Sequence, residues 1–250
     1  MILRRLAEGV RQQDWFTVVV EVLIVVVGIF LGLQVDDWNE ARKDRIDERL
    51  FITRLHGDIL LAEKLSSSRL DRRLGRLESM ITAADVLFAR SEREVLSEDE
   101  CRAVSATHYF NVSIPELPSL SELVGAGRMS IIRDRELRFA LVELQPIRSA
   151  LSTLIALQSA RAIDLPEKYV DLIRLEAKYT AEDDEVHSFP KCDLAGMRAN
   201  RAFLNDFSQN SDRYDAYVKD GLAPWSAQMD KIHRLVDEAL GFTHGEEQIP

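Results

Sequence analysis

The first clear pattern in the chain is an apolar run, residues 15–35, whose only charged residue is Glu21. As a helix rising about 1.5 Å per residue, 21 residues span roughly 30 Å, the thickness of a bilayer's hydrocarbon core. Aromatic residues of the kind found at membrane interfaces lie at its two ends, Trp15 and Phe16 at the start and Trp38 just after the end. The pattern predicts a transmembrane helix.

A cleaved signal peptide is the alternative interpretation of this run. Its apolar region would be shorter, about 7 to 15 residues, and small residues would follow at a cleavage site. Here the polar sequence Gln34-Val35-Asp36-Asp37-Trp38 comes next, without such a site. We therefore expect an uncleaved signal anchor.

One face of the expected membrane helix combines an acid with small residues. At 100° per residue, Glu21, Gly28 and Gly32 fall within about 40° of one another, and Thr17 lies on the flank. A carboxylate within hydrocarbon is costly unless it is protonated or faces protein or water. A GxxxG spacing lets two helices approach closely. The face predicts helix–helix association, and whether Glu21 also carries protons is left open.

After the membrane segment, residues 36–90 contain no proline and show helical periodicity. Apolar residues recur mostly at steps of three and four, namely Ile46, Leu50, Leu55, Ile59, Leu70, Leu74, Leu77, Ile81, Ala84 and Leu87. This predicts a long amphipathic helix, either a coiled-coil stalk or a member of a bundle. Gly57, Gly75 and the serines at 66–68 are expected to mark bends or breaks.

The remaining residues, 91–241, are expected to form a helical domain, followed by a tail at 242–250. Ser97 with Glu100, and Ser119 with Glu122, fit capping boxes that open short helices. Helices are also expected after Asp134, between Pro146 and Pro166, at 194–207 and at 214–240, and Gly241 is expected to cap the last one. Gly125-Ala126-Gly127 is expected to cap a helix, and the acidic residues 180–191 to form a loop. The predicted fold is all-α: a short flank (1–14), a transmembrane helix, a long juxtamembrane helix and a soluble helical bundle.

Composition and charge exclude some partners and leave the cysteines open. The net charge is −10 and no basic stripe interrupts it, so phosphates would be repelled and nucleic acid is not an expected partner. The two cysteines, Cys101 and Cys192, would be buried thiols in the cytosol, or a disulfide in an oxidising compartment.

Chemistry-bearing residues form no recognised catalytic or metal-binding spacing. The five histidines are at positions 56, 108, 187, 233 and 244. His56 with Asp58 and Glu63, and His233 with Asp230 and Asp237, are interpreted as surface charge pairs rather than metal sites. Cys101 and His108 are a conceivable nucleophile and base without a third, orienting group. We expect no catalytic residue, no cofactor and no metal.

Two stretches resemble an uncharacterised family of bacterial single-pass membrane proteins, a domain of unknown function. The first is EVLIVVVGIFLGLQVDDWNE, where Glu21, Gly28, Leu33, Gln34 and the Trp38-Asn39-Glu40 motif fit the family pattern, whereas Val20 replaces its usual glycine and Gly32 stands where alanine is common. The second is ELVGAGRMSIIRDRELR, with Ala126-Gly127 in place of Ser-Gly. The resemblance implies a bacterial single-pass topology and no activity.

Three functions follow as hypotheses. The leading one is a non-enzymatic protein of the bacterial inner membrane that acts by self-association or with another membrane protein. The second is an extracytoplasmic ligand sensor that signals through a partner, and the third is a membrane-tethered enzyme. Basic residues lie on both sides of the apolar run, Arg4, Arg5 and Arg11 before it and Arg42, Lys43, Arg45 and Arg49 after it. Long C-terminal domains are exported largely regardless of charge, so we favour a cytoplasmic N-terminus and a periplasmic domain.

Overall fold

The computed structural model describes residues 15–242 except 111–113 and 181–184, and side chains at 15–18, 65–69, 180 and 185 are also outside the description. The predicted flank (1–14) and most of the predicted tail (242–250) therefore lie outside the described residues. The chain divides into two units, residues 1–51 and 52–250. The described part is mainly helical with one small sheet, which confirms the all-α prediction.

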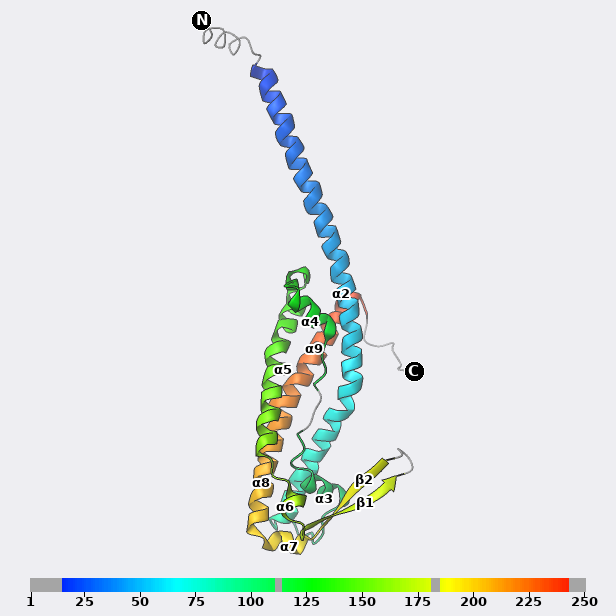
Figure 1. Ribbon diagram of the computed structural model, residues 1–250, viewed down its shortest axis with the longest axis vertical. Helices are drawn as coiled ribbons and strands as arrows, with labels where there is room; N and C mark the ends of the chain where they lie inside the picture. The colour runs from blue at the N-terminus through cyan, green and yellow to red at the C-terminus, as the bar shows by residue number, and fades with distance from the viewer. Residues whose placement is uncertain (1–14, 111–113, 181–184, 243–250) are drawn as a thin grey trace. The chain divides into compact units, whose positions relative to one another are not determined.

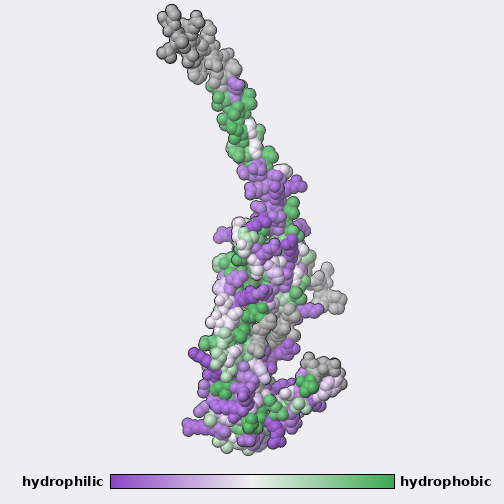
Figure 2. Space-filling view, viewed as in Figure 1, coloured by the Kyte–Doolittle hydropathy of each residue, from purple (hydrophilic) through white to green (hydrophobic). Residues whose placement is uncertain are grey.

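The first described element is a single helix, α2, Trp15–Leu87, of 73 residues. Within the first unit it carries a band of exposed apolar side chains followed by a hydrophilic stretch (Figure 2). This N-terminal apolar helix is long enough to cross a membrane. Gly57 and Gly75 do not break the helix, because α2 continues through both glycines. Helical hydrogen bonding tolerates an isolated glycine at about 1 kcal/mol.

A second stretch, Arg135–Lys168, also meets the length and composition of a membrane span. It contains the helix α5, whose residues Leu137, Ala140, Leu141 and Leu144 are buried against the rest of the second unit. Other apolar residues of α5, such as Phe139 and Val142, are exposed, so the helix buries one face.

In the second unit α2 buries a face that overlaps only in part with the predicted stripe. Leu55, Ile59, Leu77 and Leu87 are buried as expected, together with Ala62, Met80, Ala83 and Val86. The predicted positions Leu74 and Ile81 are instead 45% and 56% exposed. The buried face is therefore that of a bundle helix, and it includes alanine and methionine positions that the leucine pattern did not single out.

The helices that follow α2 are α3 (Glu98–Ser105), α4 (Pro118–Gly125), η1 (Met129–Ile131), α5 (Arg135–Arg161), α6 (Leu165–Lys168), α7 (Leu194–Ala199), α8 (Arg201–Ala216), η2 (Tyr217–Leu222) and α9 (Ala223–Leu240). In Figure 1, α5 and α9 lie side by side, and their backbones are in contact. The expected break at Pro146 was wrong, since Pro146 lies inside α5. The break expected between helices at 208–213 was also wrong, because α8 contains these residues and continues directly into η2 and α9.

The ends of the helices can be compared one by one with the capping signals in the sequence. The capping box of Ser97 and Glu100 is confirmed, with both reciprocal hydrogen bonds present. The second box was wrong: α4 begins at Pro118, and the Ser119 N–H donates to Asp58 Oδ2 at 2.8 Å. Gly127 (φ +66°) follows the end of α4 and Gly241 (φ +79°) that of α9, both in the left-handed conformation that glycine adopts readily.

The expected acidic loop at 180–191 was wrong as well. Residues Ile173–Thr180 (β1) and Glu185–Cys192 (β2) form an antiparallel hairpin in which Ile173 pairs with Cys192. The segment IRLEAKYT does alternate apolar and polar residues, which is a strand pattern. Only its first apolar residue, Ile173, is fully buried, and Leu175 and Tyr179 are exposed.

The base of the hairpin joins a compact core in the second unit. This core contains Ala83, Val86, Leu87, Val104, Leu165, Ile173, Leu194, Met197, Phe203 and Phe207. Arg198 of α7 closes the end of α2, because its Nε and a terminal nitrogen donate to the Val86 carbonyl at 3.0 and 2.8 Å. A cation at a helix C-terminus satisfies carbonyls that have no partner within the helix.

Candidate functional site

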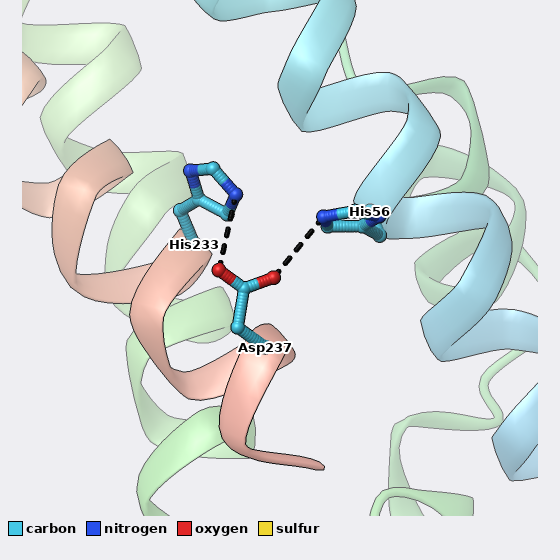
Figure 3. Close-up of side chains that lie close together, drawn as sticks. All are labelled: His56, His233 and Asp237. Atoms are coloured by element: carbon cyan, nitrogen blue, oxygen red, sulfur yellow. Dashed lines mark ion pairs between the residues drawn. The ribbon is translucent and has the colours of Figure 1, made fainter. Parts of the chain in front are cut away.

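Two helices of the second unit bring four polar side chains together. His56 and Glu63 lie on α2, and His233 and Asp237 lie on α9. Seven residues are about two helical turns and four are about one, so each pair shares a face of its helix. Figure 3 shows His56, His233 and Asp237 converging across the space between the two helices.

Asp237 lies at the centre of this cluster. Its Oδ1 is 3.1 Å from His56 Nε2, and its Oδ2 is 3.3 Å from His233 Nε2. On its other side, the His233 ring places Nδ1 at 2.7 Å from Glu63 Oε1. The two imidazole rings are 5.5 Å apart between centroids. One carboxylate therefore joins the two rings, and a second carboxylate holds one of them.

The cluster is shielded from solvent to an unequal degree. The side chain of Asp237 is 5% exposed, those of His56 and His233 are 16% and 18% exposed, and that of Glu63 is 30% exposed. The Phe242 ring lies 5.3 Å from that of His56. A buried carboxylate requires polar or cationic partners to offset lost hydration, and the two imidazoles supply them.

This arrangement supports two kinds of chemistry. With protonated imidazoles it is a network of ion pairs between α2 and α9. With neutral imidazoles it offers two nitrogen donors and a carboxylate, a ligand set suited to divalent transition metals.

Sequence reasoning placed these residues in two separate pairs and missed the cluster. His56 and His233 were grouped with neighbours in sequence, yet Glu63 and His233 are 170 residues apart. The interpretation as exposed surface pairs was wrong for these side chains, because Asp237 is buried and both histidines are largely covered. The local signal was the i, i+4 pair of His233 and Asp237; its partner helix was not readable from the sequence.

The predicted face of the membrane helix lies in the first unit. Glu21, Gly28 and Gly32 all belong to α2 and are exposed. A Cβ built at either glycine would meet no atom within 4 Å. Trp38, expected at the interface, is 61% exposed. Trp15, Phe16 and Thr17 also belong to α2, and their side chains lie outside the described part, so the role of this face stays a prediction.

The cysteines, left open by the sequence, form a disulfide between α3 and the end of β2. Cys101 and Cys192 have Cα atoms 5.9 Å apart. A thiolate is the nucleophile in cysteine catalysis, so the disulfide leaves no such role for Cys101 beside His108. His108 instead has its Nε2 at 3.4 Å from Asp164 Oδ2, and desolvation by burial lowers its pKa, although Asp164 opposes this.

Comparison of the chain with models of protein families, with curated proteins and with solved structures finds no match.

Proposed function

We propose that this protein is a single-pass protein of the bacterial inner membrane that acts by association of its membrane helix, either with a second copy or with another membrane protein. Its helical domain is exported to the periplasm, and its N-terminus stays in the cytoplasm. The bacterial assignment rests on the family resemblance of the sequence.

The observation that carries the association is the position of Glu21. It is an exposed acid on an apolar helix, on the same face as two glycines at which a Cβ would meet no atom within 4 Å. An acidic residue at the centre of a membrane helix raises the free energy of insertion by about 2.5 to 3.5 kcal/mol. A partner helix packed against Gly28 and Gly32 offers hydrogen-bonding groups to the carboxyl and removes it from lipid.

The disulfide supports the orientation. Disulfides persist in oxidising compartments such as the periplasm and are rare in the cytosol. Cys101 and Cys192 both lie in the second unit. Export of residues 52–250 places both cysteines where oxidation is sustained.

Energy transfer between fluorophore-labelled chains, measured in native-composition vesicles, tests the association. Gly28→Leu fills the helix face beside Glu21 and is expected to lower the transfer several-fold. Val26→Leu enlarges a side chain on the far side of the same helix and serves as the matched control. Equal transfer in wild type and Gly28→Leu would argue against this face as the interface.

An extracytoplasmic sensor is the second candidate. It is favoured by α2, which contributes residues both to the apolar segment and to the core of the second unit. A ligand that shifts α2 within the bundle would then act on the helix that enters the membrane. Ligand-dependent changes in the same energy-transfer assay would favour this function over constitutive association.

A further inference from the structure

We propose that His56, His233 and Asp237 bind a divalent first-row transition metal, of which Zn²⁺ is the representative. Glu63 acts as a positioning residue behind His233. This site goes beyond the proposed membrane association, and neither depends on the other.

The donor atoms are already close to the spacing that such an ion requires. One ligand atom from each of the three residues lies within 4.8 Å of the others. The nitrogen–oxygen distances are 3.1 Å from His56 Nε2 to Asp237 Oδ1 and 3.3 Å from His233 Nε2 to the other oxygen, Oδ2. Tetrahedral Zn²⁺ with bonds of about 2.0–2.1 Å places adjacent ligands roughly 3.3–3.4 Å apart. The third separation is between the donor nitrogens of His56 and His233, which lie on different helices. Small rotations of the two rings would shorten it.

Glu63 fixes the state of His233 in which it can bind a metal. In the neutral tautomer whose Nδ1–H donates to Glu63 Oε1, 2.7 Å away, the lone pair lies on Nε2, the nitrogen nearest Asp237. Metal-binding histidines usually donate their second ring N–H to a carboxylate or carbonyl in this way. In the metal-free protein the same two contacts suit a protonated His233, whose two ring N–H groups each face a carboxylate, and a metal ion would replace the proton on Nε2.

The donor types select the class of ion. Two imidazole nitrogens and one carboxylate suit Zn²⁺, Co²⁺ or Ni²⁺, whereas Mg²⁺ and Ca²⁺ prefer sites made of oxygen ligands. The metal neutralises the charge of Asp237 and Glu63 together. Three protein ligands leave a coordination position to water, and the partial exposure of both histidines gives water access.

A bound ion would link two parts of the second unit that are far apart in the sequence. His56 lies near the start of that unit and His233 near its end, 177 residues later. An ion bound only by the folded state shifts the folding equilibrium toward it by mass action. Metal binding would therefore stabilise the contact between α2 and α9.

The test uses full-length protein in detergent, carrying an affinity tag without histidines and freed of metal by a chelator. Equilibrium dialysis against Zn²⁺ is expected to give one ion per chain. His233→Ala and His56→Ala are each expected to weaken binding by at least about 100-fold, and Glu63→Gln by about 10-fold, the range found for residues behind a metal ligand. His187→Ala, on β2, is the matched control and should bind like wild type.

Co²⁺ provides a second readout that does not depend on affinity alone. The visible spectrum of bound Co²⁺ should show nitrogen and oxygen ligation in wild type and should change in Asp237→Asn, even if that variant is less stable. Less than about 0.1 Zn²⁺ per chain in wild type would overturn the proposal. Equal binding by wild type and a folded His56→Ala, His233→Ala double variant would overturn it as well.

Discussion

Cys101 and Cys192 join α3 to the last residue of β2 and close a loop of 91 residues. The same cysteine, Cys192, pairs with Ile173 in the hairpin register, and Ile173 belongs to the core that also holds Val104 of α3. The disulfide therefore fixes the base of the hairpin to the core of the second unit.

Replacing both cysteines by serine should lower the free energy of unfolding. In the chain-entropy model, closing a loop of this length stabilises the fold by about 4–5 kcal/mol. Urea denaturation of the Cys101→Ser, Cys192→Ser double variant measures the loss. Wild type with reducing agent should behave like the variant, and an unchanged unfolding midpoint in both would contradict the structural role of the bond.

Replacing Asn210 by leucine should destabilise the second unit by about 2–4 kcal/mol. Its buried amide donates to Thr107 Oγ1 and the Ile163 carbonyl, and its oxygen accepts the Ile163 N–H. In the leucine variant the Thr107 hydroxyl and the Ile163 N–H and carbonyl groups lose these hydrogen bonds. Ser208→Ala, an exposed change on the same helix, is the control. It should change the free energy of unfolding, measured by urea denaturation, by less than about 0.5 kcal/mol.

Stability should fall as the pH drops below the ordinary histidine pKa of 6.5, because burial lowers the pKa of His108 in the folded state. The unfolded chain then takes up a proton that the folded protein does not bind until a lower pH, so acidification favours unfolding across that interval. His108→Gln should flatten this part of the pH–stability curve, measured by thermal unfolding. His187→Gln serves as its control, and an undiminished slope in His108→Gln would refute the assignment.

A C-terminal alkaline phosphatase fusion should be active in bacterial cells, because this enzyme needs an oxidising compartment to form its own disulfides. The proposed orientation places the C-terminal domain in the periplasm. A C-terminal fluorescent protein that folds only in the cytosol should stay dark. The reverse pair of results would place the domain in the cytosol.

The sequence predicted the elements whose signals are local. The apolar run 15–35 is a continuous stretch, and the capping box at Ser97 and the glycine cap at Gly241 depend on residues within a few positions of one another. Pro146 did not end α5, because packing of its buried face against the core outweighs the lost hydrogen bond. The hairpin was missed although IRLEAKYT alternates, since most of its apolar residues face solvent rather than a core.

The candidate site could not be predicted because its parts come from opposite ends of the second unit. His56 and Asp237 are 181 residues apart, and each has nearer acidic or basic neighbours that explain it equally well. Only the contacts between side chains of α2 and α9 show that the two carboxylates and two imidazoles share one space. The disulfide was open for the same reason, since spacing alone does not show that two cysteines meet.

The most direct test of the proposed membrane association is photocrosslinking in native membranes, with the probe at Val25, which is exposed on α2 near Glu21. Mass spectrometry then identifies the captured molecule. We expect one defined protein product, either a second copy of this chain or a single other membrane protein, and its loss in Gly28→Leu. Capture of lipid alone, or a product unaffected by Gly28→Leu, would contradict the proposal.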